Sequence, residues 1–265
     1  MNRDLIKTLI TMIKTLISGN PTFKKEYPTD NPYFLEVAEF FMNTVQGEGV
    51  NTGCAAAFLR VQRCSMNCIW CDTQEVWRFG NPWTFDELFF LMEKSGLIDN
   101  FRQGQHLVLT GGSPLKQQKA LSLFLNDFYG RYNFLPYLEI ENECTIMPND
   151  WMQTHIDCWN NSPKLSNSGN LDIVRYQPGL LQKLSALNNS WFKFVVTNDK
   201  DWKEIQTDFL DKGLIKRKQI MLMPQGATRE ELHANRDKVV QMTIRENVRF
   251  SDRFHIELWD KKTGV

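Results

Sequence analysis

Residues 60–73 read Arg60-Val-Gln-Arg-Cys64-Ser-Met-Asn-Cys68-Ile-Trp-Cys71-Asp-Thr73 and begin at the end of an apolar run of strand length, Ala56–Val61. One short loop therefore holds three cysteines, separated by three residues and then by two. A structural zinc site closes around four ligands, whereas a 4Fe–4S cubane held by three cysteines keeps one iron open for a substrate or cofactor. The loop thus predicts an iron–sulfur site with an open coordination position, as a reactive site requires.

The remaining cysteines form no second close pair. Cys54, Cys144 and Cys158 are scattered, as are the four histidines, so a zinc ion would lack an evident fourth ligand. A chain of 265 residues and 31.0 kDa can build a generous hydrophobic core without disulfides. We therefore expect reduced cysteines and a cytoplasmic protein.

The composition is that of a soluble globular protein, with 42% hydrophobic and 23% charged residues. The 31 Lys and Arg residues balance the 31 Asp and Glu residues, so no bulk charge favours nucleic acid or a membrane surface as a direct partner. No apolar run reaches the roughly 18 residues of a membrane span. The sequence thus predicts neither kind of partner.

The first 20 residues carry apolar side chains at helical spacing, with an end signal at Gly19-Asn20-Pro21. This pattern predicts an amphipathic helix that packs on its own domain or on a second subunit. Three prolines in residues 20–32 indicate a linker. We therefore divide the chain into an N-terminal helix and linker, 1–32, and a catalytic domain, 33–265.

From residue 33 onward, apolar runs alternate with helical patterns, which predicts an α/β fold with a mostly parallel sheet. The predicted strands are Phe34–Phe41, Ala56–Val61, His106–Leu109, Tyr137–Ile140, Ile156–Trp159, Trp191–Val196 and Gln219–Met223. The predicted helices are Thr84–Ser95, Leu115–Tyr129, Leu180–Leu187, Asp201–Lys212 and Thr228–Arg245. Capping boxes are expected at Thr84–Glu87 and Thr228–Glu231.

Polar or glycine-rich segments follow several of these strands. They are the cysteine loop, Thr110-Gly111-Gly112, Glu141-Asn142 and Pro224-Gln225-Gly226. Ligands of mostly parallel sheets collect at the carboxyl ends of the strands. We therefore expect these segments to surround one catalytic mouth.

The motif Cys64-x3-Cys68-x-Trp70-Cys71 resembles the signature of the radical S-adenosylmethionine (SAM) superfamily. More narrowly, residues 34–265 resemble the 7-carboxy-7-deazaguanine synthase family. The matching segments occur in the family's order and are Val45–Gly49, Phe58–Arg60, Cys71–Thr73, Thr110–Gly112, Ser162–Lys164 and the tail His255-x3-Trp259-x4-Gly264-Val265.

The resemblance implies a partial, modified radical-SAM (β/α) barrel with an N-terminal helical extension. It implies a carbon–nitrogen lyase that converts 6-carboxy-5,6,7,8-tetrahydropterin to 7-carboxy-7-deazaguanine with loss of ammonia, a step of queuosine and deazapurine biosynthesis. The implied cofactors are a 4Fe–4S cluster, SAM and Mg2+. The implied partners are a reducing electron donor of flavodoxin or ferredoxin type and a second copy in a homodimer.

Site residues are implied in the same way. Cys64, Cys68 and Cys71 would bind the cluster, and Thr73 would bind Mg2+. The implied SAM contacts are Trp70, Asp72, Gly112, Ser113, Asn142, Ser162, Pro163, Lys164 and Gln225. The implied substrate contacts are Val45, Gln46, Gly47, Glu48, Arg60, Thr110, His255 and the terminal carboxylate of Val265.

Two positions depart from the pattern of this family. Ser113 stands where relatives commonly carry Glu or Asn, which would weaken recognition of the amino group of SAM or shift it to the backbone. Cys144 stands where they carry Gly in a Glu-Thr-Asn-Gly-Thr-like run, which puts the local backbone shape in question.

Two alternatives stay open at this point. A glycyl-radical-activating enzyme shares the cysteine spacing and a Gly-Gly strand end, but would not explain Gln46–Gly49 or the tail Trp259–Val265. A non-catalytic descendant of the synthase fold is favoured by Ser113 and Cys144, while the retained cysteines argue against it.

Overall fold

The computed structural model describes residues 24–28, 31–262 and 264. The N-terminal helix, part of the linker and Val265 lie outside the described residues, so the predictions about them and about the domain boundary stay predictions. In the described part of the chain, no helix combines the length and apolar character needed to cross a bilayer.

Among the described residues, nine strands form one sheet in the order β3-β1-β2-β4-β5-β6-β7-β8-β9. The strands are β1 Phe34–Val45, β2 Ala55–Val61, β3 Asn81–Thr84, β4 His106–Gly111, β5 Tyr137–Asn142, β6 Cys158–Asn161, β7 Ser190–Val196, β8 Ile220–Pro224 and β9 Arg249–Phe250. β1 is antiparallel to β2 and β3, and every pairing from β2 to β9 is parallel. The order has two ends, so the predicted partial barrel is confirmed as an open, curved sheet.

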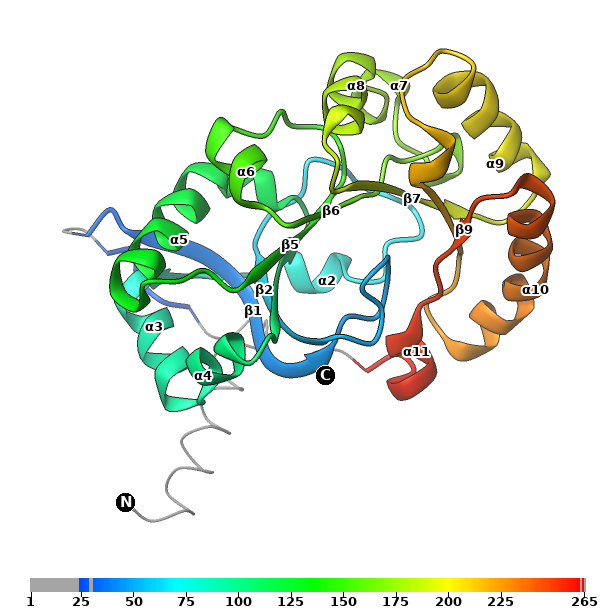
Figure 1. The fold of residues 1–265 in the computed structure, drawn as a ribbon. Coiled ribbons are helices and arrows are strands. Elements are labelled where there is room, and N and C mark those ends of the chain that lie inside the picture. The colour runs from blue at the N-terminus through cyan, green and yellow to red at the C-terminus, as the bar shows by residue number, and fades with distance from the viewer. Residues whose placement is uncertain (1–23, 29–30, 263, 265) are drawn as a thin grey trace.

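Helices cover the outer side of this sheet, as Figure 1 shows for α3 to α10. The helices are α2 Gln74–Trp77, α3 Phe85–Lys94, α4 Leu97–Arg102, α5 Gln118–Tyr132, α6 Asp150–His155, α7 Asp172–Arg175, α8 Pro178–Ala186, α9 Asp199–Glu204, α10 Arg229–Glu246 and α11 Phe254–Trp259. The main core lies between this helical layer and the sheet. For example, Phe89 of α3 and Phe124 of α5 stack with ring centroids 4.9 Å apart.

Local sequence signals explain the helix boundaries. The Thr84 hydroxyl accepts from the Glu87 amide at 3.3 Å, and the Glu87 carboxylate accepts from the Thr84 amide at 2.9 Å, which confirms the first capping box. At α10 the Thr228 hydroxyl caps the helix, but the Glu231 carboxylate accepts from the Ala227 amide at 2.7 Å. The prediction of the second capping box is therefore right for the Thr228 cap and wrong for the return hydrogen bond, which Glu231 makes to Ala227 in place of Thr228.

The predicted strands are all present, with shifts at their ends. The strand predicted at Ile156–Trp159 lies at Cys158–Asn161, because Ile156 ends α6. The helix predicted at Asp201–Lys212 is α9 followed by a π-helical segment, Ile205–Leu210. The sequence reading missed β3 and β9, which are short, and β3 contains a proline.

Candidate active site

The carboxyl ends of the parallel strands surround a cavity of about 290 Å³. Residues from each of the four segments expected to converge line it, which confirms the predicted mouth: the cysteine loop, Thr110–Gly112, Glu141-Asn142 and Pro224–Gly226. Residues of α11 and of the tail, including His255 and Gly264, line the same cavity. Segments that are distant in the sequence thus meet at one site.

The three clustered cysteines all reach this cavity. Cys64, Cys68 and Cys71 are half-buried and form no disulfide. The Met66 amide donates to Cys64 Sγ at 3.3 Å, and Asn170 Nδ2 donates to Cys68 Sγ at 3.2 Å. Donors aimed at sulfur suit the thiolates that bind an iron–sulfur cluster.

A distant segment holds the cysteine loop in place. The Asn67 amide donates to Asn170 Oδ1 at 3.0 Å, and the Ile69 amide donates to the Ser168 carbonyl at 3.0 Å. The indole N–H of Trp70 donates to the Asn167 carbonyl at 3.1 Å. Residues 167–170, between β6 and α7, therefore fix the loop that carries the thiols.

The donor set fits a cluster. Within the described ranges, no three His, Cys, Asp or Glu side chains converge around one metal ion. Three thiols that are spread along the wall of one cavity suit a cluster, in which each cysteine binds a different iron. Burial raises the pKa of the Cys64 and Cys68 thiols above its usual value. Cluster binding would release their protons, since a ligated thiol is deprotonated.

Most of the residues predicted to contact SAM line the cavity. They are Trp70, Asp72, Gly112, Asn142, Ser162, Lys164 and Gln225. Lys164 Nζ donates to Ser162 Oγ at 2.7 Å and lies 5.6 Å from the centroid of the Trp70 ring. The Ser162 amide donates to the Asn142 carbonyl at 2.7 Å, which joins β5 to this segment.

Ser113 and Pro163 are the predicted SAM contacts that do not line the cavity. Ser113 is completely buried, and its hydroxyl lies 3.6 Å from Cys64 Sγ as a donor. Its backbone amide donates to the Arg63 carbonyl at 2.9 Å. Ser113 therefore holds the cysteine loop through its contacts with Arg63 and Cys64.

The described residues predicted to contact the substrate all line the cavity; Val265 lies outside the described residues. They are Val45, Gln46, Gly47, Glu48, Arg60, Thr110 and His255. Arg60 Nε donates to Glu39 Oε2 at 2.9 Å, and both side chains are largely buried. This ion pair fixes the guanidinium at the cavity wall.

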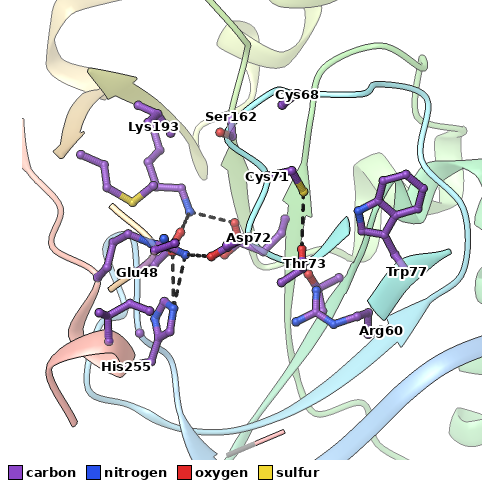
Figure 2. Close-up of a pocket in the computed structure, with 18 of the residues that line it drawn as sticks. Glu48, Arg60, Cys68, Cys71, Asp72, Thr73, Trp77, Ser162, Lys193 and His255 are labelled. Atoms are coloured by element: carbon purple, nitrogen blue, oxygen red, sulfur yellow. Dashed lines mark hydrogen bonds and ion pairs between the residues drawn. The ribbon is translucent and has the colours of Figure 1, made fainter. Parts of the chain in front are cut away.

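Thr73 lies beside Cys71 in the close-up of the cavity (Figure 2). Thr73 Oγ1 is 3.8 Å from Cys71 Sγ, and it lines the cavity as predicted for a Mg2+ ligand. The hydroxyl that was predicted to bind the metal thus lies next to the last cysteine of the loop.

A charged network also lines the cavity (Figure 2), and the sequence reading missed its two cations, Lys193 and Arg253. Lys193 Nζ bridges Glu48 and Glu141, with 3.0 Å to Glu141 Oε2. Arg253 pairs with Glu48, at 2.9 Å from Nε to Oε1, and with Asp72. Lys193 was detectable as a lone charge in the apolar run of β7, whereas nothing in the sequence marked Arg253.

This network sets the charge of its members. Burial alone would raise the pKa of Glu48, but Lys193 and Arg253 hold it well below its usual range. Burial raises the pKa of Glu141, with Lys193 opposing and Glu48 adding to the rise. Burial lowers the pKa of His255 in spite of Glu48, so its imidazole is neutral near pH 7.

Comparisons with known proteins agree with the geometry. A family model described as "4Fe-4S single cluster domain" matches residues 45–137. A 7-carboxy-7-deazaguanine synthase from Pyrobaculum aerophilum is 30% identical over 232 residues, which cover 87% of this chain and 97% of that protein. The enzyme of the same name from Halobacterium salinarum is 27% identical, over 85% of this chain and 91% of its own length.

The fold also matches a solved structure, the crystal structure of QueE from Escherichia coli. The TM-score is 0.61 at 22% sequence identity, over 84% of this chain and 95% of that one. That likeness concerns the fold, while the Pyrobaculum match extends over nearly the whole relative. The chain belongs to the 7-carboxy-7-deazaguanine synthase family.

Proposed function

We propose that this protein converts 6-carboxy-5,6,7,8-tetrahydropterin to 7-carboxy-7-deazaguanine with loss of ammonia, as a carbon–nitrogen lyase that uses SAM and Mg2+ together with its 4Fe–4S cluster. One observation carries the proposal. A single cavity brings the three free thiols together with the residues that the family resemblance assigns to SAM and to the pterin.

When bound, the cluster supplies one electron to the sulfonium of SAM, and the protein orients the reactants and excludes water. Lys164, held by Ser162, provides a cation for the carboxylate of SAM. Trp70, whose indole N–H is already bonded to the Asn167 carbonyl, offers its ring to the adenine. Cys64, Cys68 and Cys71 would hold the cluster and would leave one of its irons open to SAM.

The pterin is held by complementary polar groups. Arg60 binds its carboxylate with the terminal nitrogens, because Nε is used by Glu39. Gln46 and Glu48 bind the edge of the ring. Glu48 is kept ionised by its two cations and therefore accepts hydrogen bonds at this edge. The neutral imidazole of His255 can donate from one nitrogen and accept at the other.

Further parts of the proposal concern partners. The Thr73 hydroxyl would supply an oxygen ligand to Mg2+, which suits the preference of this ion for oxygen. A reducing protein of flavodoxin or ferredoxin type supplies the electron. The protein acts as a cytoplasmic homodimer, with neither nucleic acid nor membrane as a direct partner.

The test is product analysis after anaerobic turnover. The protein is loaded with iron and sulfide, reduced, and incubated with SAM, Mg2+ and the pterin, and the products are analysed by mass spectrometry. We expect 7-carboxy-7-deazaguanine from the parent protein and none from Cys68→Ala, which should remain soluble. A reduced, cluster-loaded sample that cleaves SAM but yields no deazaguanine would favour a glycyl-radical-activating enzyme. Iron without SAM cleavage would favour a non-catalytic descendant.

A further inference from the structure

A buried carboxylate beside the cysteine loop has no role in the site described above. Glu143, directly after β5, is 5% exposed and lines the cavity. Its Oε2 is buried and has no hydrogen-bond partner among the described residues. A buried carboxylate oxygen without a partner destabilises the folded protein. The orphaned oxygen therefore indicates a donor that arrives with a ligand.

The other carboxylate oxygen is already satisfied. Glu143 Oε1 accepts from Ser65 Oγ at 2.9 Å and from Thr145 Oγ1 at 2.6 Å. Ser65 follows Cys64 directly, and its hydroxyl also lies 2.8 Å from Ser113 Oγ. These hydroxyls tie the carboxylate to the loop that carries the thiols, and Oε2 is the carboxylate oxygen that is left without a donor.

The neighbouring cations do not supply that donor. Lys193 and Arg253 pair with other carboxylates, and Lys164 donates to Ser162. Ser113 cannot bind a ligand in the cavity, because its side chain is completely buried against Cys64 and does not line it. Glu143 is thus the carboxylate next to the cysteine loop that is left for a ligand N–H.

We propose that Glu143 Oε2 accepts a hydrogen bond from the α-amino group of SAM. This inference rests on the proposed function, in which the three cysteines would hold a cluster that leaves one iron open to SAM. A carboxylate that is fixed by two hydroxyls and faces an N–H donor forms a strong, charge-assisted hydrogen bond. The contact comes from the end of β5, whereas Ser113, at the end of β4, supports the loop.

The test measures binding without pterin. Equilibrium dialysis on the anaerobic, cluster-loaded protein gives dissociation constants for SAM and for an analogue with hydrogen in place of the α-amino group. Glu143→Gln should weaken SAM binding by about 10- to 100-fold, the range for a hydrogen bond to a charged group. Binding of the analogue should change less than about twofold, because the analogue has no amino group that could donate to Glu143. Iron content should stay at the parental level.

Thr145→Val is the matched control, since it removes one hydroxyl from the network and keeps the carboxylate. It should retain SAM affinity within a few fold. The inference is overturned if Glu143→Gln weakens both ligands equally, if it loses the cluster, if Thr145→Val has the same effect, or if the parent binds no SAM. A parent that binds SAM as expected but makes no deazaguanine would refute the proposed function and leave the assignment of Glu143 standing.

Discussion

Replacing Lys193 by Met removes the central cation of the charged network. Lys193 is 2% exposed, and its Nζ contacts both Glu48 and Glu141. Methionine keeps most of the apolar stem but leaves two neighbouring carboxylates without their shared partner. Glu48 keeps Arg253 at 2.9 Å. The charge left uncompensated is therefore mainly that of Glu141.

The size of the effect follows from these contacts. At 3.0 Å, the distance to Glu141, one ion pair is worth about 5 kcal/mol at an effective dielectric constant of about 20. The variant no longer has to remove a lysine ammonium from water, which offsets part of this loss. Repulsion between the Glu48 and Glu141 carboxylates adds to the loss. We therefore expect Lys193→Met to lower the free energy of unfolding by about 3–5 kcal/mol, as for other broken buried pairs.

Urea unfolding, followed by tryptophan fluorescence and circular dichroism, checks this value. With a slope of about 3 kcal/mol per molar urea, the midpoint should fall by about 1–1.7 M. The double variant Lys193→Met/Glu141→Gln should recover half of the loss or more, because it removes the stranded charge. Lys200→Met, at an exposed lysine, should change the free energy of unfolding by less than about 0.5 kcal/mol.

The pH dependence gives an independent check. Burial already raises the pKa of Glu141, and loss of Lys193 removes the cation that opposes this rise. The folded variant then holds a proton more tightly than its unfolded chain, so its stability increases as the pH falls. Its deficit against the parent should therefore shrink as the pH falls from neutral toward the usual pKa of a glutamate. A loss below about 1 kcal/mol, or a deficit that does not change with pH, would refute the reasoning.

Three further substitutions test other parts of the site. Arg60→Ala should weaken pterin binding by about tenfold or more while SAM binding is retained; equal loss of both, measured by equilibrium dialysis, would make the arginine structural. Thr73→Val should raise the Mg2+ concentration that gives half-maximal turnover by about tenfold, and an unchanged titration would remove Thr73 from the metal site. Cys144 has φ of 66°, so Cys144→Gly should stay within about 1 kcal/mol of the parent in urea unfolding while Cys144→Val loses about 2 or more. Equal stability of these two variants would contradict the argument.

Much of the fold was predictable because its signals are local. A parallel strand that is buried on both faces is a short apolar run, as in β4, and turn or polar residues mark its end. The carboxyl ends of such strands share one edge of the sheet, so the motifs at those ends had to converge. β9 has two residues, and the pairing with β8 that defines it cannot be detected from such a short stretch.

The missed site residues show where this reasoning stops. Lys193 and Arg253 act through contacts with residues that lie 52 to 205 positions away in the sequence. Contacts between residues so far apart produce no recognisable spacing pattern in the sequence. Ser113 occupies a position that the resemblance assigns to SAM, but its hydroxyl is directed at Cys64. Side-chain direction at a strand end depends on the neighbouring loop, which a motif does not specify.

The structure gives a packing reason for Gly112, the second residue of the Gly111-Gly112 pair. The sequence suggests bare backbone that can approach a ligand, but a Cβ on Gly112 would lie 2.4 Å from Cys64 Cβ and 2.5 Å from the Arg63 carbonyl oxygen. Gly112 is therefore needed so that the cysteine loop can pack against the end of β4. Gly112→Ala should displace this loop and lower the iron bound per chain, whereas Gly130→Ala, in open space on α5, should leave it unchanged. Parental iron content in Gly112→Ala would show that the loop can yield, and the glycine would then be explained by ligand approach alone.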